Sequence, residues 1–356
     1  MAADVRILLL GDSHLGFDLP VRPRAGRRRR GHDFLANYAS ALAPAMDGEV
    51  DAVVHAGDVF NRSQVVASVA YQAYDPLRRI ADRGIPVYIV PGNHERSRLP
   101  HPGLLSHSRI QVFDRPRTFS ATIRGTTISF SGFPYERRDV RTNFRELVTQ
   151  TRWQETAAAV RFLCIHHCVE GATCGPGNFT FTTASDVIRA RDIGAPFAAV
   201  FTGHIHRHQV LRLRVPVLYP ASIERTSFAE IDEPKGFIIV HVAVSEGDYD
   251  VRWEFRPLRA RPMQQHELDA DTLTAEALEQ AVRTIVNVAP DDAVISIRLS
   301  GAMSDGHWRA IASSNMRSIV PPTMNVDVRP AGGFVVRRPS RTLIAPALSD
   351  LQLSFC

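Results

Sequence analysis

The feature that most constrains the fold is a set of five short apolar runs, each of which ends in a cluster of Asp, His, Asn or Gly residues. The runs cover residues 5–10, 50–54, 87–90, 161–165 and 198–201. Such runs, bounded by Gly and Pro, are typical of strands that are buried on both faces. Helical patterns lie between them, for example over residues 65–81. This alternation predicts an α/β fold whose polar clusters follow the carboxyl ends of strands, where such sheets place their chemistry.

The pattern changes after residue 220. Apolar segments at 235–244 and 249–255 predict a hairpin, and the Arg- and Pro-rich stretch 256–262 predicts a linker. Beyond it, the pattern predicts a helix at 274–288, a strand at 295–299, a short helix at 304–313 and a strand at 324–328. We therefore predict a first domain over 1–258, a small α+β domain over 259–333 and a tail over 334–356.

Composition excludes several classes of protein. The 356 residues are 44% apolar and 22% charged, unlike a disordered chain. The net charge of +5 permits a polyanionic partner. Lys235 is the only lysine among 42 Lys and Arg residues, and arginine binds phosphate in a bidentate manner. No apolar run approaches the roughly 18 residues that cross a bilayer. The four cysteines form no disulfide framework. We therefore expect a soluble protein of the cytoplasm with no membrane partner.

The polar clusters share a donor set that is typical of metal sites. Their members are Asp12, His14, Asp58, Asn93, His94, His166, His204 and His206. Imidazole and carboxylate groups bind divalent Zn, Mn, Fe or Ni, and this many ligands suits two ions that share a carboxylate. Positions i and i+2 of an extended segment point the same way, so Asp12 and His14 can converge, as can the two histidines at 204 and 206. A lone histidine is more often an ordinary buried or surface side chain, and we interpret His55 in that way.

The sequence around these residues resembles a known family. The matching motifs are GDSHLG at 11–16, HAGDVF at 55–60, PGNHE at 91–95, GHIHRHQVL at 203–211, YPASIERTSF at 219–228 and EPKGF at 233–237. In this order they resemble the calcineurin-like metallophosphoesterases and, within them, the SbcD-type DNA-repair exonucleases. The resemblance is strong over residues 5–240 and weak over 260–334. It implies a two-sheet αββα sandwich followed by a small capping domain.

The resemblance also implies a role for each polar residue. One metal ion would be bound by Asp12, His14 and His206. A second ion would be bound by Asn93, His166 and His204. Asp58 would bridge the two ions, and His94 would act on the scissile phosphate instead of binding metal.

Three positions depart from the family pattern. Asn61 stands where some archaeal members carry a histidine that bears on exonuclease activity. Ala221 replaces the usual glycine, which we expect to be tolerated. His167 follows His166 where relatives often have glutamine, so the tandem leaves two candidates for one ligand; we favour His166.

The implied function is dinuclear-metal-dependent hydrolysis of DNA phosphodiester bonds, in DNA repair or DNA-end processing. Hydroxide activated by two ions roughly 3.5–4 Å apart would attack the phosphorus. His94 would protonate the leaving sugar oxygen, and help of this kind is typically worth about 10²–10⁴-fold. Manganese is the metal that the resemblance implies, while the ligand set also admits zinc, iron and magnesium.

A basic stretch follows the first polar cluster. It contains Arg22, Arg24, Arg27, Arg28, Arg29 and Arg30. A run of charge is often only a solvated surface. The functional alternative is that the stretch rims the metal site and neutralises DNA phosphates, which would add to the salt dependence of binding.

Two other functions stay open. The same metals could serve a phosphodiesterase for small nucleotides or a phosphatase. The chain could also be a DNA-end-binding scaffold without catalysis. The basic stretch and the second domain favour a long polyanion as substrate, and the complete set of ligand positions favours an enzyme.

The resemblance bears on partners as well. SbcD-type nucleases work with a coiled-coil ATPase, whose docking segment follows the capping domain. Residues 334–356 look too short for a two-helix docking element. An ATPase partner, coiled-coil or other, therefore stays open, and so does a homodimer formed through the first domain.

Overall fold

The computed structural model describes residues 3–18, 29–245 and 248–331. Most of the chain forms two six-stranded mixed sheets. The first has the order β16-β15-β1-β2-β3-β4, with β1 Ala3–Leu10, β2 Ala52–His55, β3 Val87–Ile89, β4 Ile110–Val112, β15 Lys235–Ser245 and β16 Asp248–Leu258. The second has the order β13-β14-β12-β7-β6-β5, with β5 Arg117–Ile123, β6 Thr126–Gly132, β7 Val160–Ile165, β12 Ala199–Thr202, β13 Gln209–Leu211 and β14 Val217–Tyr219.

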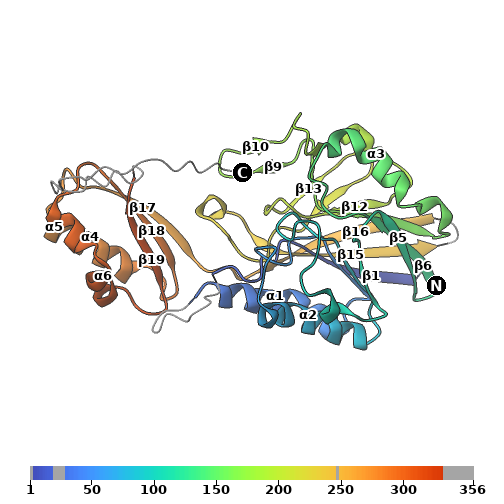
Figure 1. Cartoon of the computed structure of the whole chain (residues 1–356), viewed down its shortest axis with the longest axis horizontal. Coiled ribbons are helices and arrows are strands. Elements are labelled where there is room, and N and C mark those ends of the chain that lie inside the picture. Colours follow the sequence, from blue (N-terminus) through green and yellow to red (C-terminus); the bar gives the residue numbers. More distant parts are fainter. Residues whose placement is uncertain (1–2, 19–28, 246–247, 332–356) are drawn as a thin grey trace, which may run out of the picture.

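Helices cover the outer face of each sheet. The first sheet is covered by α1 (Gly31–Met46) and α2 (Ala67–Asp82), and the second by α3 (Val140–Gln150) (Figure 1). The short strand pairs are β8 (Cys168–Val169) with β11 (Val187–Ile188), and β9 (Thr173–Cys174) with β10 (Phe179–Thr180). The layers therefore follow the order helix, sheet, sheet, helix, which confirms the predicted αββα sandwich.

Strand β1 shows why the strands read as nearly continuous apolar runs. Leu8 and Leu10 pack in the cluster under α1 and α2. Ile7 and Leu9 pack in the cluster between the two sheets. All four side chains are fully buried. Because both faces of the sheet are covered, the strand has no solvent side on which polar residues could alternate.

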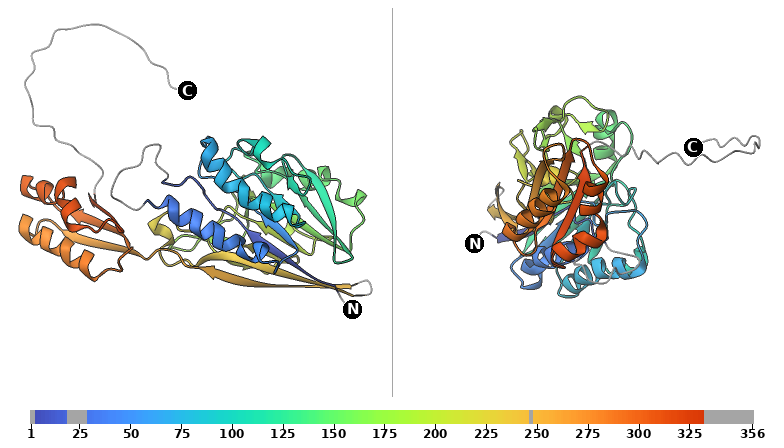
Figure 2. Two further views of the ribbon diagram at one scale, coloured as in Figure 1. Left: turned by 90° about the horizontal axis from the view of Figure 1, so that it is seen from below. Right: turned by 90° about the vertical axis from the view of Figure 1, so that its left-hand side faces the viewer.

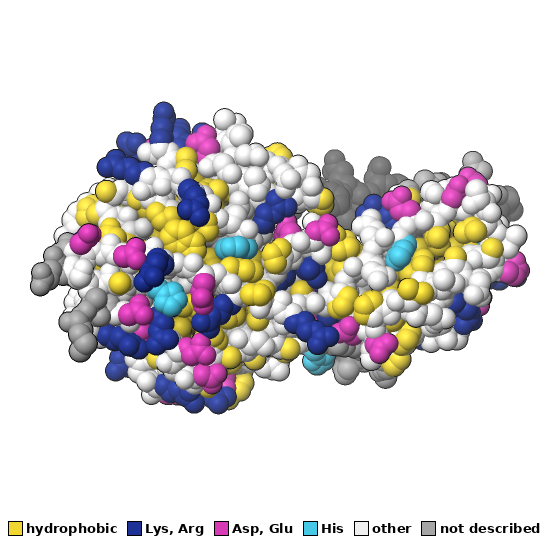
Figure 3. Space-filling view, turned by 180° about the vertical axis from the view of Figure 1, so that it is seen from behind, with side chains coloured by type: hydrophobic (Ala, Val, Ile, Leu, Met, Phe, Trp, Pro, Cys, Tyr) yellow, Lys and Arg dark blue, Asp and Glu magenta, His cyan; other side chains and the backbone are white. Residues whose placement is uncertain are grey.

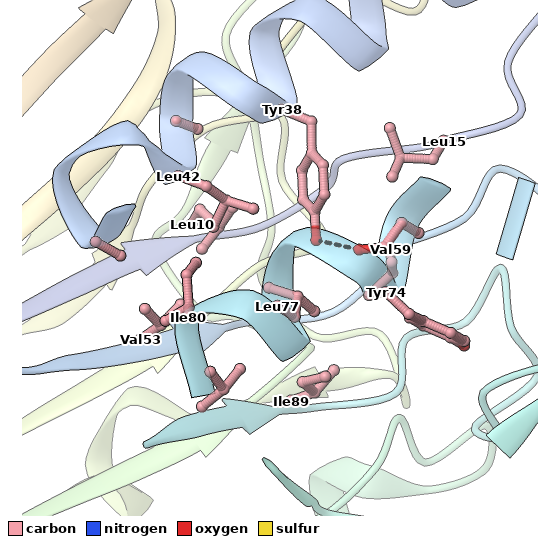
Figure 4. Close-up of a cluster of buried hydrophobic side chains, with 14 of the residues drawn as sticks. Leu10, Leu15, Tyr38, Leu42, Val53, Val59, Tyr74, Leu77, Ile80 and Ile89 are labelled. Atoms are coloured by element: carbon pink, nitrogen blue, oxygen red, sulfur yellow. Dashed lines mark hydrogen bonds between the residues drawn. The ribbon is translucent and has the colours of Figure 1, made fainter. Parts of the chain in front are cut away.

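The cluster under α1 and α2 fixes these helices on the first sheet (Figure 4). Tyr38 of α1, Leu77 and Ile80 of α2 and Val53 of β2 are all members of this cluster. The Tyr38 hydroxyl donates to the carbonyl of Ala73 at 3.1 Å, so the ring is buried without losing a hydrogen bond. Full burial of side chains of this size is worth about 1.5–3 kcal/mol each.

Residues 263–330 form a second, smaller unit. Its strands are β17 (Met263–Asp269), β18 (Val294–Ser300) and β19 (Asn325–Pro330), and its helices are α4 (Ala275–Val288), α5 (Asp305–Ala310) and α6 (Ser313–Ile319). The three strands are parallel and form a sheet of their own. A separate apolar cluster lies between sheet and helices, and Leu278, Val282, Ile295 and Ile297 are among its members. The helix, strand, short helix and strand expected from the sequence are present as α4, β18, α5 and β19, whereas β17 and α6 were not predicted. The domain boundaries stay a prediction.

The stretch expected as a linker, 256–262, differs from the expectation. Strand β16 continues to Leu258, because its pairing with β15 extends to the contact between Leu258 and Lys235. Arg261 is only 4% exposed. Its guanidinium donates to Oδ2 of Asp33 (3.0 Å), Oδ1 of Asn325 (2.7 Å) and the carbonyls of Asp292 (2.7 Å), Thr323 (3.0 Å) and Ala293 (3.5 Å). We call this cluster the Arg261 joint, because it connects α1 to the smaller unit.

The smaller unit is a distinct lobe at one end of the molecule (Figure 2). The side opposite to Figure 1 shows cationic and anionic side chains interspersed over both lobes (Figure 3). Among the described helices, none combines the length and the apolar character needed to cross a membrane.

Candidate metal centre

Five loops meet where strands of the two sheets end. The loops after β1, β2 and β3 leave neighbouring parallel strands of the first sheet, and those after β7 and β12 leave neighbouring parallel strands of the second. The Asp12 amide donates to the Gly57 carbonyl at 2.9 Å, and the His14 amide to the Asp58 carbonyl at 3.0 Å. The His204 amide donates to Oδ1 of Asp12 at 2.9 Å and so joins the two sheets. The polar clusters of the sequence therefore lie together.

The first group of side chains consists of Asp12, His14 and His206. Their candidate ligand atoms all lie within 4.8 Å of one another. Nε2 of His14 lies 2.9 Å from Nε2 of His206. Asp12 and His14 are completely buried. Two imidazole nitrogens that face each other beside a carboxylate form a donor set that suits a divalent cation.

The second group consists of Asn93, His166 and His204. Oδ1 of Asn93 lies 3.0 Å from Nε2 of His166 and 2.9 Å from Nδ1 of His204. Nδ1 of His166 donates to the carbonyl of Ala56 at 2.7 Å. Because Nδ1 is used in this bond, Nε2 is the ring nitrogen that faces the group, as in histidines that bind metal.

Asp58 lies between the two groups. Its Oδ2 is 3.3 Å from Nε2 of His166 in the second group and 3.9 Å from Nε2 of His14 in the first. Asp58 is 2% exposed, so its charge is shielded from water. This position is the one that a carboxylate shared by two ions requires.

The backbone of these loops is held in uncommon conformations. Four residues of the two groups and the carboxylate between them have positive φ: Asp12 (48°), His14 (43°), Asp58 (50°) and His204 (78°). Each such conformation costs on the order of 1–3 kcal/mol and persists where the surroundings enforce it, typically at functional sites. Gly57, with φ of 102°, is needed because a Cβ there would overlap the ring of His166.

The electrostatics of the cluster fit divalent cations. Oδ2 of Asp12 is buried and has no hydrogen-bond partner among the described residues. Burial raises the pKa of Asp12 to about 6, although the His166 and His206 rings oppose this. Burial opposes protonation of His166, but the nearby Asp58 carboxylate outweighs it and raises the pKa of His166 to about 9. Carboxylates and imidazoles crowded in this way suit a site whose charge is balanced by bound cations.

His94 lies at the edge of the cluster. Its side chain is 38% exposed, and Nε2 is 3.9 Å from Oδ2 of Asp58. Its Nδ1 donates to the main-chain carbonyl of Asn61 at 2.8 Å. The orientation of His94 therefore depends on the backbone at Asn61, not on the side chain that departs from the family pattern.

The other two departures also have a structural outcome. Of the tandem histidines, only His166 belongs to the cluster. Nε2 of His167 accepts from the amide of Glu136 at 2.9 Å, and its ring stacks on Tyr135. Ala221 has φ of 80°, a conformation that glycine adopts without strain, so alanine here is tolerated at some energetic cost.

A buried carboxylate that sequence analysis did not single out supports one of the histidines. Oε1 of Glu230 accepts from Nδ1 of His206 at 3.1 Å. Burial opposes ionisation of Glu230, but the bond to His206 and the charge of Lys235 outweigh it and hold the pKa of Glu230 well below its usual value. The sequence feature that could have indicated this support is the pair of Glu230 and the only lysine, Lys235, which follow the GHIHR motif at 203–207.

A second carboxylate ties two loops of the cluster together. Glu95 accepts from the amide of Phe60 at 2.6 Å and from the amide of Gly92 at 2.8 Å. Burial raises the pKa of Glu95 to about 8. Glu95, the last residue of the PGNHE motif, therefore holds the loop after β2 against the loop after β3.

The basic stretch is only partly described. Arg22, Arg24, Arg27 and Arg28 lie outside the described residues. Arg29 pairs with Asp18 at 2.9 Å. Arg30 is 8% exposed; its guanidinium donates to the carbonyl of Arg225 and lies over the Phe17 ring. The guanidinium of Arg30 is thus enclosed by neighbouring residues, and the phosphate contacts expected of Arg29 and Arg30 stay a prediction.

Comparison with known proteins places this geometry in context. The family described as calcineurin-like phosphoesterase matches residues 5–208. The chain is 30% identical to the DNA double-strand break repair protein Mre11 of Haloferax volcanii over 83% of this chain and 61% of that protein. It is 28% identical to the Mre11 protein of Halobacterium salinarum over 83% of this chain and 70% of that one.

A solved structure shows a weaker likeness. It is a dimetal phosphatase from Danio rerio, with a TM-score of 0.40 and 12% identity, over 67% of this chain and 95% of that one. The match to the Haloferax protein leaves more than a third of that relative's length without a counterpart in the aligned region.

Proposed function

The chain belongs to the calcineurin-like phosphoesterase family, and from this premise we propose that it is a DNA nuclease that depends on two divalent metal ions. Family membership supports hydrolysis of phosphoesters. The similarity to DNA double-strand break repair proteins supports DNA as the substrate, and DNA repair or DNA-end processing as the role.

The observation that carries the proposal is the position of Asp58 between two groups of ligand atoms. In the proposed assignment, one ion is held by Asp12, His14 and His206, and the other by Asn93, His166 and His204. Oδ2 of Asp58 lies within 3.9 Å of ring nitrogens from both groups. A single ion would leave most of these donors unused, whereas two ions that share Asp58 use all of them.

The side chains divide the chemistry among them. Two divalent cations in this position would supply charge compensation for the phosphoryl oxygens and lower the pKa of an attacking water. Asp58 would be shared by the two ions, because it lies next to both groups of ligands. His94, fixed through Nδ1 by the Asn61 carbonyl, presents Nε2 at the exposed side of the cluster, where it would hold a proton for the leaving sugar oxygen.

Several finer assignments are part of the proposal. Manganese is proposed as the metal, with zinc, iron and magnesium as the alternatives to be compared. The basic stretch, made up of Arg22, Arg24, Arg27, Arg28, Arg29 and Arg30, is proposed to contact DNA phosphates. An ATPase partner and a homodimer stay predictions.

The test is hydrolysis by the purified chain of 5′- and 3′-labelled single- and double-stranded DNA with Mn, Mg or Zn, beside bis-p-nitrophenyl phosphate. We expect cleavage of DNA only when metal is present, and a His94→Ser variant that binds two ions but cleaves about 10²–10⁴-fold more slowly. His101→Ser, at an exposed histidine of the same segment, is the matched control and should cleave normally. Cleavage of the small ester with intact DNA would favour a small-nucleotide enzyme instead.

The basic stretch has its own test. Replacement of Arg22, Arg24, Arg27 and Arg28 by glutamate should weaken DNA binding and flatten its dependence on salt, because fewer counterions are released. The control is charge reversal at Arg283, a half-buried arginine of the smaller unit that pairs with Glu279. An unchanged salt slope in the first variant would show that the stretch is a solvated surface.

A further inference from the structure

The only lysine of the chain is buried behind the proposed metal centre. Lys235 is 1% exposed and begins strand β15. Its Nζ lies 2.6 Å from Oε2 of Glu230 and 2.8 Å from the carbonyl of His206. The other carboxylate beside Nζ is Glu233, at 3.5 Å. A buried ammonium needs acceptors of this kind. Here Glu230 and Glu233 precede the lysine closely in the sequence, whereas His206 is 29 residues away.

These contacts act on His206 at two points. Lys235 bonds to the main-chain carbonyl of His206 directly, and it bonds to Glu230, which accepts from Nδ1 of the His206 ring. Fixing Nδ1 as the donor leaves Nε2 directed at the group of Asp12 and His14. The main chain and the ring of this one histidine therefore depend on the same ammonium.

The lysine is itself held in place. Its backbone pairs with Leu258 in the strand pair β15–β16. Glu233 receives a further bond from Arg207, at 3.0 Å from Nε to Oε1. Glu230 accepts from the Thr226 hydroxyl at 2.6 Å. These contacts hold Lys235 and Glu230 in place, so the ring of His206 is supported by residues that are themselves fixed.

The chemistry of the site explains why a lysine stands where the rest of the chain uses arginine. An ammonium carries three donors on one atom, whereas a guanidinium spreads five donors over a planar fork. The acceptors around Lys235 converge on a single point, Nζ. Arginine at this position would have to displace either Glu230 or the His206 carbonyl.

We propose that Lys235 is a positioning residue that fixes the imidazole of His206 for the ion bound by Asp12, His14 and His206. The proposal rests on the proposed function, because it requires His206 to be a metal ligand. It predicts an asymmetric effect: loss of the ammonium weakens one of the two ions and leaves the other, which His206 does not bind, unaffected.

The first test is calorimetric titration of metal-free protein with Mn. Lys235→Met should weaken one binding step by about 10–100-fold, the usual effect of losing support behind a ligand, and leave the other step unchanged. His206→Ala identifies that step, because it should affect the same one more strongly. Arg261→Met is the matched control, since it removes another buried cation that contacts carboxylate but no proposed ligand.

The outcomes separate the two proposals. Two ions that bind to Lys235→Met as tightly as to the unaltered chain overturn the positioning role. Equal weakening in Lys235→Met and Arg261→Met overturns it too, because the effect would then come from general destabilisation. An unaltered chain that binds no divalent ion contradicts the proposed function itself.

A second measurement needs no variant and so does not depend on the folding of one. Lysine labelled with ¹³C and ¹⁵N gives a single set of side-chain resonances, because the chain has one lysine. Titration with diamagnetic Zn should shift the Cε resonance of Lys235, with saturation when the ion at His206 is bound. A resonance that does not move while calorimetry records both ions would overturn the proposal.

Discussion

The Arg261 joint and the proposed metal centre are both buried and both rich in charge, yet their hydrogen bonding is opposite. Arg261 has five N–H groups, and each finds an acceptor in the joint. In the metal centre, Oδ2 of Asp12 has no partner among the described residues, and the ring nitrogens of His14 and His206 face each other. The hydrogen bonds of the joint are complete, whereas the centre keeps a buried acceptor, Oδ2 of Asp12, without a donor among the described residues.

The difference distinguishes a structural cluster of charges from one that binds. A buried polar group without a partner costs about 1–3 kcal/mol, so a stable chain satisfies such groups unless function needs them. Arg261 holds two units together and gains by saturation. The proposed metal centre has an unpartnered buried oxygen and strained loops, so it gains stability only when a bound cation pairs with that oxygen.

The largest expected effect distinguishes Asp58 of the metal centre from Asp33 of the joint. Asp58→Ala should lose both metal ions and reduce DNA cleavage to background, because one carboxylate serves both ligand groups. Asp33→Ala, the matched change in the joint, should lower thermal stability but retain both ions and cleavage. The measurement is calorimetric metal stoichiometry beside cleavage of labelled DNA. If Asp58→Ala kept two ions, the carboxylate would not be shared.

The next effect concerns the stability of the joint. Arg261→Met should lower the free energy of unfolding by about 3–5 kcal/mol, because it removes the cation from a buried ion pair. Denaturant unfolding in the presence of a chelator measures this without any contribution from bound metal. Arg283→Met removes a surface cation of the smaller unit and should leave the midpoint nearly unchanged. Equal midpoints in the two variants would mean that the joint contributes little.

A smaller effect follows from adding metal. At a free Mn concentration 100 times the dissociation constant, each occupied site should raise the free energy of unfolding by about 2.7 kcal/mol. Thermal unfolding with and without Mn reports this. Arg261→Met should show the same gain from its lower starting point, and Asp58→Ala should show none. A gain in Asp58→Ala would place metal binding outside the strand-end cluster.

The smallest effect involves His55, which lies behind the centre. Its Nε2 is 2.8 Å from the Ser13 hydroxyl, and burial lowers the pKa of His55 to about 3. The unfolded chain takes up a proton near pH 6.5 and the folded chain does not, so stability falls as the pH drops below that value. His55→Gln should reduce the loss between pH 8 and pH 5 by about 2 kcal/mol. The measurement is denaturant unfolding of metal-free protein as a function of pH, and an unchanged loss of stability in His55→Gln would contradict the prediction.

Much of the fold could be predicted because its signals are local. The apolar runs identify β1, β2, β3, β7 and β12, and the polar residues that follow them identify the loops that meet. Parallel strands bring the ends of neighbours to one edge, so a pattern along the chain becomes a pattern in space. The ligand roles themselves came from the family resemblance and stay proposals.

The supporting residues could not be predicted because their partners are remote in sequence. Arg261 stands in a stretch that resembles a linker, and its acceptors come from α1 and from residues 292–325. Arg30 belongs to a run of arginines, and its packing against the carbonyl of Arg225 and the Phe17 ring is visible only in the structure. Lys235 was visible as a lone lysine, but composition does not tell which carboxylates surround it.

Because Lys235 is the only lysine and is buried, its chemical reactivity can be used to detect local unfolding of this chain. An amine-directed reagent meets no lysine on the folded surface and reacts with this side chain only when β15 separates from its surroundings. The rate of acylation of Lys235 therefore measures how often the region behind the proposed metal centre opens locally. Measured with and without a saturating cation, that rate would show how far occupancy of the cluster locks the sheet beneath it.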